Sequence, residues 1–230
     1  MRRGDFGIAL LLLLATLLSV VPQIRLQDWT GTEGRRVQVS TEMLQSGDYL
    51  LPTLSHQPIY TKPPLHYWLT AGAQSLFGDG YVAARIPSVV LLWGLAVLAF
   101  VLQRRVFGVG AAWVAALGIL WSPLVLAEFA SAEIDPLFAS LTAASLFLLA
   151  AGAGERRRGL LFAAGAVGGL AFLEKGPPYL LFASGAWLVW WRHRGGRGFL
   201  VYALPLFLPL LAYYALLVIL RGDAQGLGST

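Results

Sequence analysis

Long, nearly uninterrupted runs of apolar residues alternate with short polar segments along the whole chain. A helix of about 20 apolar residues crosses the hydrocarbon core of a bilayer, where only helices and closed barrels satisfy their backbone groups. The pattern predicts an all-α integral membrane protein, a multi-span helical bundle with about seven transmembrane helices. The predicted spans are residues 6–24, 82–102, 109–127, 134–151, 159–173, 179–191 and 198–220.

The first apolar run follows Arg2 and Arg3, an arrangement that a cleaved signal peptide also has. No clear small-x-small cleavage site precedes Gln27, so we expect an uncleaved first helix. The chain, residues 1–230, is then predicted to be a single membrane domain that ends in a Gly-rich, polar, flexible tail at 222–230.

Residues 25–81 form the longest segment between predicted spans, and we expect them to be the first extracytoplasmic loop. Residues 40–44 are typical of a short amphipathic helix, which should stop near the Ser-Gly-Asp turn at 46–48. A second short helix is predicted over 65–77, close to the membrane interface. Prolines impose a stiff, extended path between the two helices; they are Pro52, Pro58, Pro63 and Pro64.

Composition agrees with a membrane protein, because the chain is 57% hydrophobic and 13% charged, about half the charged fraction of a soluble domain. It has no cysteine, which excludes disulfides and cysteine metal sites. The net charge of +5 comes largely from arginines in alternate loops, while most acids lie in the other loops. The positive-inside rule therefore predicts a cytoplasmic N-terminus, with arginines against lipid headgroups and no nucleic-acid partner. The arginines on the predicted inner side are Arg2, Arg3, Arg104, Arg105, Arg156, Arg157, Arg158, Arg192, Arg194 and Arg197.

Ionisable residues also gather at the outer ends of predicted spans, where a cluster of charge at membrane depth indicates a functional site. They are Glu128, Glu133, Asp135, Glu174 and Lys175. The spans on either side of Lys175 are short for a full crossing, so their connection at 174–178 should lie below the surface and line a cavity. We expect Asp135 and Lys175 to line the same outer cavity. Gly165 and Gly169 are spaced for close packing of the same span against a neighbour.

The run YTKPPLHYWL at residues 60–69 places Lys62 before two prolines and the second loop helix. A lysine whose backbone is fixed in this way favours a defined anion site. The alternative is a lysine whose ammonium group simply extends from the membrane edge toward water.

The stretch TEGRRVQVSTEMLQSGDYLLPTLSHQPIYTKPPLHYWLTAGAQSLFG, residues 32–78, resembles the first extracytoplasmic loop of lipid-linked sugar transferases of the GT-C fold. The relatives that it is most similar to are the bacterial 4-amino-4-deoxy-L-arabinose lipid A transferases and the dolichyl-phosphate-mannose protein mannosyltransferases. The later stretches SAEIDPL at 131–137 and GLAFLEKGP at 169–177 are similar to two further motifs of this family. The similarity follows the same order over nearly the whole chain.

The resemblance implies a GT-C-like membrane glycosyltransferase of the bacterial inner membrane. It would transfer a sugar from a polyprenyl phosphate to a lipid, glycan or protein acceptor on the outer face. Lys62 matches the family lysine that contacts the donor phosphate, and a compact ammonium group suits that role. Arg35 matches a family arginine, and Arg36 replaces a tyrosine and would add a phosphate contact. Membrane lipid and the polyprenyl-phosphate-linked sugar are the implied partners, and no cofactor is expected.

The catalytic carboxylate departs from the family pattern. Aligned without gaps, Thr32 stands where the family has its favoured base, and threonine cannot act as a base near neutral pH. Glu33 is the nearest replacement and is our predicted catalytic residue. Asp28 is less well placed for this role. The alternative is that Glu33 merely faces water and has no catalytic role. Thr61 replaces a glutamate that binds metal in some members, and the histidines show no metal-ligand spacing, so no metal site is predicted.

Relatives of this kind continue beyond the length of this chain. The resemblance therefore leaves three forms open: a fragment, a split gene product whose partner is a separate C-terminal half chain, or a shortened relative. Two other functions also stay open. One is a non-catalytic protein that binds lipid phosphate, and the other is an unrelated transporter-like protein, for which the chain shows no convincing internal repeat.

Overall fold

The computed structural model describes residues 3–26, 28, 31–155, 157–194 and 199–226. Helices account for most of this part of the chain, as predicted. It also contains an antiparallel hairpin of two strands with two residues each, in which Thr53 pairs with Pro58 and Leu54 with Gln57. The elements are α1 (Arg3–Leu26), α2 (Glu33–Ser46), β1 (Thr53–Leu54), β2 (Gln57–Pro58), α3 (Leu65–Phe77), α4 (Tyr81–Leu120), α5 (Pro123–Phe129), α6 (Ile134–Glu155), α7 (Arg158–Lys175), α8 (Pro178–Arg194) and α9 (Phe199–Gly226).

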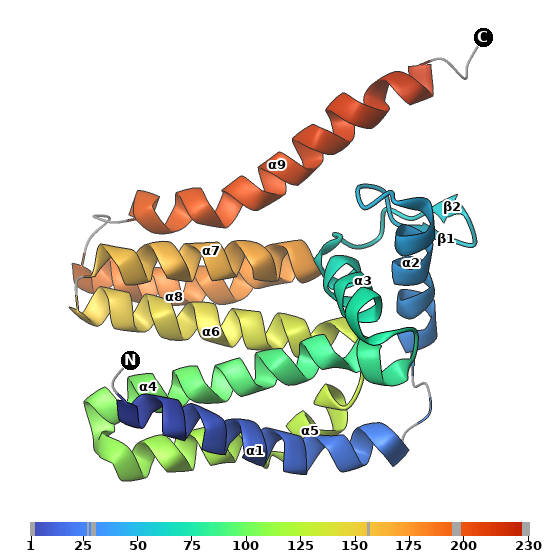
Figure 1. The fold of residues 1–230 in the computed structure, drawn as a ribbon. Coiled ribbons are helices and arrows are strands. Elements are labelled where there is room, and N and C mark those ends of the chain that lie inside the picture. The colour runs from blue at the N-terminus through green and yellow to red at the C-terminus, as the bar shows by residue number, and fades with distance from the viewer. Residues whose placement is uncertain (1–2, 27, 29–30, 156, 195–198, 227–230) are drawn as a thin grey trace.

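The long helices lie roughly parallel in one bundle, and α2, α3 and the hairpin cover one end of it (Figure 1). We call this end the loop end. Helix α4 reverses direction at the opposite end, where α6 ends and α7 begins (Figure 1). The left-handed φ of Gly108, 84°, is not helical, so α4 consists of two antiparallel arms, 81–107 and 109–120. The T-shaped contact of Phe100 with Trp113, with ring centroids 4.9 Å apart, packs one arm on the other.

Within the described residues, four segments are long and apolar enough to span a membrane: Phe6–Ile24, Tyr81–Leu120, Ile134–Gly154 and Leu200–Leu220. They confirm an integral membrane protein of the helical class, but not the predicted count of about seven spans. The predicted span 109–127 ends at Leu120, because Pro123 starts the separate short helix α5. The predicted spans 159–173 and 179–191 correspond to α7 and α8, which are shorter than the four long segments.

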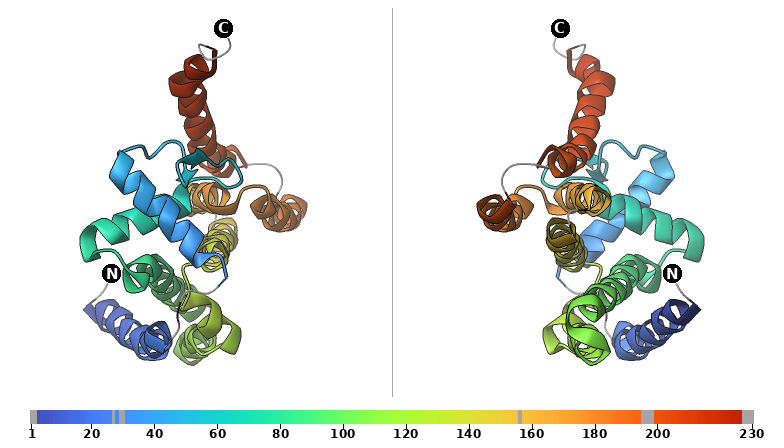
Figure 2. Two further views of the ribbon diagram at one scale, coloured as in Figure 1. Left: turned by 90° about the vertical axis from the view of Figure 1, so that its right-hand side faces the viewer. Right: turned by 90° about the vertical axis from the view of Figure 1, so that its left-hand side faces the viewer.

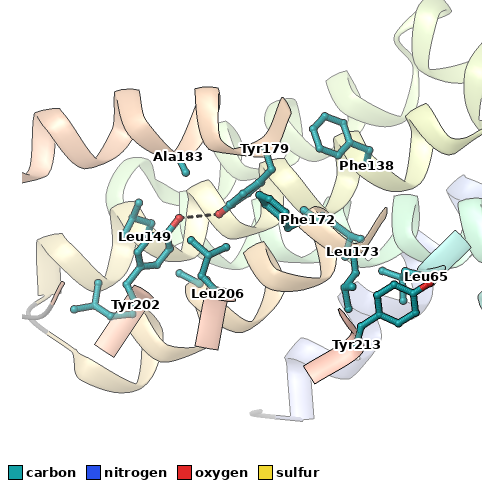
Figure 3. Close-up of a cluster of buried hydrophobic side chains, with 14 residues drawn as sticks. Leu65, Phe138, Leu149, Phe172, Leu173, Tyr179, Ala183, Tyr202, Leu206 and Tyr213 are labelled. Carbon is teal, nitrogen blue, oxygen red and sulfur yellow. Dashed lines mark hydrogen bonds between the residues drawn. The ribbon is translucent and has the colours of Figure 1, made fainter. Parts of the chain in front are cut away.

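The core of the bundle consists of two clusters of buried side chains. One joins α1, both arms of α4 and α5, and the other joins α6, α7, α8 and α9 with the start of α3. In the second cluster the hydroxyls of Tyr179 and Tyr202 lie 2.8 Å apart (Figure 3). Ser145 Oγ lies 2.7 Å from Tyr179 Oη. These buried hydroxyls therefore satisfy one another within the apolar interior.

Close contact between α7 and α9 depends on glycines, as the sequence predicts. A Cβ atom on Gly165 would lie 2.1 Å from the carbonyl oxygen of Tyr202, and one on Gly169 would lie 2.8 Å from that of Pro205. Beyond this contact α9 leaves the bundle (Figures 1 and 2). It remains helical to Gly226, past the point where the flexible tail was predicted to begin, and residues 227–230 lie outside the described part.

The two loop helices occur where the sequence predicts them. Helix α2 is longer than expected and ends at Gly47, whose left-handed φ of 70° lets its N–H bond to Met43 O at 2.9 Å. Helix α3 has the predicted bounds and begins after Pro64, whose carbonyl accepts the first helical hydrogen bond from Trp68 N. Trp68 Nε1 also donates to the Tyr49 carbonyl at 2.6 Å, which fixes the intervening chain on α3.

Candidate functional site

A cleft of about 200 Å³ opens at the loop end, between the first turn of α2, the hairpin, the segment before α3 and the start of α6. Three cationic side chains line it, together with apolar and hydroxyl-bearing side chains. Its lining residues are Thr32, Arg35, Arg36, Val39, Leu54, Ile59, Thr61, Lys62, Tyr67 and Ile134. The structure thus brings together Lys62, Arg35 and Arg36, the three basic residues predicted to bind a phosphate.

Lys62 and Arg35 have no acidic partner within salt-bridge distance in the described part of the chain. The backbone behind Lys62 is fixed, because Pro63 and Pro64 are buried and lead directly into α3. Burial raises the pKa of the Tyr67 hydroxyl above its ordinary value, so the phenol is neutral and can donate a hydrogen bond. Two unpaired cations and a phenol in one cleft form a site suited to an anion.

Arg36 does have an acidic partner, the carboxylate of Glu133 just before α6. Glu133 Oε1 accepts a hydrogen bond of 2.7 Å from Thr32 N, and both carboxylate oxygens lie within 3.2 Å of Thr32 Oγ1. The Arg36 and Glu133 side chains keep 16% and 19% of their surface exposed. Glu133 is not among the residues that line the cleft, but it contacts Thr32 and Arg36, which do line it.

Glu33, the predicted catalytic residue, does not line the cleft. Its side chain is fully buried, and both of its carboxylate oxygens accept hydrogen bonds from Arg85, at 3.0 Å from Nε and 2.8 Å from Nη2. The Ala132 N–H donates to the same carboxylate. Arg85 also donates to the carbonyls of Ile24 and Asp28, at 3.1 and 2.9 Å. This geometry joins α1, α2, α4 and the start of α6, and it favours a structural role for Glu33.

Asp135 and Lys175 form an ion pair, which joins the start of α6 to the end of α7. The sequence predicts that these residues line the same outer cavity, and the structure shows that they contact each other. They are not among the residues that line the cleft, although Ile134, next to Asp135, is. The turn after Lys175 requires Gly176, whose φ is 84°.

A second buried pair fixes α3 to the end of α7. His66 Nδ1 lies 2.9 Å from Glu174 Oε1, and the two side chains are 1% and 0% exposed. His66 lies only four positions after Lys62 in the sequence, so this contact also limits where the lysine backbone can move. Its role is therefore to hold the wall of the cleft in place.

The hairpin that carries Leu54 is held by Glu42 of α2. The Glu42 carboxylate accepts hydrogen bonds of 2.7 Å from Thr53 Oγ1, 2.7 Å from Ser55 N and 3.1 Å from His56 N. Burial acts to raise the pKa of Glu42, but these hydrogen bonds outweigh burial and the pKa lies below its ordinary value. Ser55 and His56 both have positive φ, a conformation that these bonds stabilise.

Sequence reasoning missed two residues of this region. Arg85 lies inside a predicted span, and an ionisable residue there is itself a signal that a buried partner exists. Glu133 was recognised only as one of several acids at outer helix ends. Nothing local to residue 133 indicates that it contacts Thr32, because the two lie 101 positions apart.

Comparison with known proteins defines the class of protein. Residues 61–220 match the family model described as dolichyl-phosphate-mannose-protein mannosyltransferase, and the chain belongs to this family. The match confirms the predicted resemblance to polyprenyl-phosphate-sugar transferases of the GT-C fold.

More particular similarity is to the undecaprenyl phosphate-alpha-4-amino-4-deoxy-L-arabinose arabinosyl transferases. The Pseudomonas aeruginosa (strain UCBPP-PA14) protein of this name is 31% identical over 202 residues, 83% of this chain and 37% of the relative. Arabinosyl transferase 2 of Pseudomonas fluorescens (strain Pf-5) is 32% identical over 177 residues, 74% of this chain and 30% of the relative. The chain thus spans less than two fifths of the length of these curated relatives.

Solved structures with the same fold include ArnT from Cupriavidus metallidurans. The structure bound to undecaprenyl phosphate matches with a TM-score of 0.77 and 22% identity, over 97% of this chain and 43% of that one. The apo structure matches with a TM-score of 0.72 and 23% identity, over 95% of this chain and 42% of that one. These matches confirm the GT-C-like fold.

Proposed function

We propose that this chain forms the donor-binding part of a membrane glycosyltransferase that takes a sugar from a polyprenyl phosphate. The observation that carries the proposal is the cleft at the loop end, where Lys62 and Arg35 have no acidic partner in the described residues. A phosphodiester with a long apolar tail suits a cationic cleft at the end of an apolar helix bundle. The family and the undecaprenyl phosphate named with the ArnT structure support the same donor class.

The cleft would act on the donor by holding its phosphate. Lys62 supplies a compact positive charge, and the buried prolines fix its backbone before the donor arrives, which lowers the entropy lost on binding. Arg35 adds a second positive charge. Cations in a partly desolvated cleft also stabilise the phosphate as it leaves the sugar, which is the main electrostatic demand of this transfer.

The proposal places the cleft on the outer face of a bacterial inner membrane. The reversal of α4, which follows Arg104 and Arg105, and the start of α7 at Arg158 lie at the opposite end of the bundle from α2 and α3 (Figure 1). With those arginines in the cytoplasm, the N-terminus is cytoplasmic and the cleft faces outward. A further chain or segment would bind the acceptor, in keeping with the greater length of the relatives.

Binding of undecaprenyl phosphate by the purified protein in detergent tests the donor site. Lys62→Ala should weaken binding by about 1.5–3 kcal/mol, the usual contribution of a charged hydrogen bond, or roughly ten- to a hundredfold in Kd. Lys62→Arg should restore only part of the affinity, because the guanidinium fork differs in shape from an ammonium group.

Arg105→Ala is the matched control, because it removes one exposed positive charge at the other end of the bundle. Its Kd should equal that of the wild type. If Lys62→Ala leaves binding unchanged, Lys62 does not hold the phosphate and the proposed donor site is wrong.

A further inference from the structure

We propose that Glu133 is the carboxylate that takes the proton from the acceptor O–H group during sugar transfer. The proposal rests on the proposed function, because it assigns a second role in the same cleft. It replaces Glu33, which the sequence favoured, with an acid that comes from a different part of the chain.

The local structure is built around the Glu133 carboxylate. Thr32 holds it with a backbone N–H and a hydroxyl, and Arg36 contacts it from the next turn of α2. The backbone of Gly31, with a left-handed φ of 55°, passes so close that a Cβ atom there would lie 2.8 Å from Glu133 Oε1. Two features of the loop, a glycine and a hydroxyl, thus lie directly against this one side chain.

The position of Glu133 leaves it able to react. A carboxylate has about four acceptor sites, and the contacts with Thr32 and Arg36 do not use all of them. Its side chain is 19% exposed and lies next to Ile134, a residue of the cleft wall. Thr32 also lines the cleft, so an acceptor that approaches the donor phosphate passes close to this carboxylate.

The other acids near the cleft are occupied by structural contacts. Glu33 and Glu174 are fully buried against Arg85 and His66. Glu42 is held by the hairpin, and Asp135 pairs with Lys175 away from the cleft lining. Of the acids placed here, Glu133 is therefore the one that is both partly exposed and adjacent to the cations.

The chemical step follows from this arrangement. The acceptor oxygen forms a bond to the anomeric carbon of the sugar, and its proton passes to the Glu133 carboxylate. The bond from that carbon to the phosphate oxygen breaks, and the polyprenyl phosphate leaves with the electron pair, stabilised by Lys62 and Arg35.

The test measures two quantities on the protein in its native membranes: undecaprenyl phosphate binding, and release of undecaprenyl phosphate from the sugar-charged lipid. Glu133→Gln should lower transfer about 10²–10⁴-fold, the usual contribution of a general base. Its donor Kd should stay within about twofold of the wild type. The pH profile of the residual transfer by Glu133→Gln should differ from that of the wild type.

Moving the carboxylate is a sharper test. The double variant Thr32→Asp with Glu133→Gln puts an acid in place of the Thr32 hydroxyl, which lies 3.1 and 3.2 Å from the Glu133 carboxylate oxygens, and it should recover part of the lost transfer. Glu128→Gln is the matched control, because Glu128 is exposed in the preceding helix and loses the same charge. It should behave as the wild type.

Several outcomes overturn the inference alone. One is transfer by Glu133→Gln at the wild-type rate, and another is an unchanged pH profile in that variant. A Glu133→Gln variant that loses donor binding and transfer together would show that Glu133 only positions Arg36. Absence of donor binding by the wild type would instead overturn the proposed function, and the role of Glu133 with it.

Discussion

Replacing Glu33 by glutamine should destabilise the protein rather than merely inactivate it. The substitution removes the carboxylate that pairs with the Arg85 guanidinium, which is 0% exposed and also donates to the carbonyls of Ile24 and Asp28. Removal of one partner from a buried ion pair typically costs about 3–5 kcal/mol, because the remaining charge cannot be solvated. For a chain of this size, that loss corresponds to roughly 6–20 °C in Tm.

The assay is thermal unfolding of the purified protein in detergent, with donor binding measured in parallel. A second variant, Glu33→Leu combined with Arg85→Met, removes both charges and should recover most of the lost stability. Glu128→Gln, an exposed acid, should change the free energy of unfolding by no more than about 0.5 kcal/mol. If Glu33→Gln unfolds at the wild-type temperature and yet loses transfer, the structural role is refuted and the catalytic one expected from sequence is restored.

Three further predictions follow from the packing, the loop and the charge pattern. Gly165→Leu should lower the free energy of unfolding by about 1–3 kcal/mol, because its side chain would meet the backbone of α9. Gly118→Ala, which has open space at its Cβ, is the control and should be neutral or slightly stabilising in the same thermal unfolding experiment. The lowered pKa of Glu42 means that its contribution to stability is present at neutral pH and is lost as pH falls through that pKa. Amide hydrogen exchange in the hairpin should accelerate over that acid pH range, and Glu42→Gln should remove this dependence of the exchange rate on pH. Reporter fusions should read external near Gln45 and cytoplasmic after Arg158, and the reverse result at Arg158 would refute the proposed orientation.

The sequence determined the local features of this protein. Apolar runs predict helices that cross a bilayer, because the backbone must be satisfied within each segment there. Turn and proline signals placed α2 near residues 40–44 and gave α3 its bounds, since caps and fixed φ angles act over a few residues. The glycine spacing at 165 and 169 also predicted a close helix contact, because it places two small residues on one helix face.

The tertiary structure decided which charges meet. Glu33 and Arg85 are 52 positions apart, and Thr32 and Glu133 are 101 apart, so their contacts arise only when α1, α4 and α6 pack beside the loop. Two adjacent residues, Thr32 and Glu33, therefore receive opposite environments, one exposed at the cleft and one fully buried. A sequence pattern records which residues can carry charge, but the free energy of a buried charge depends on the partner that folding brings to it.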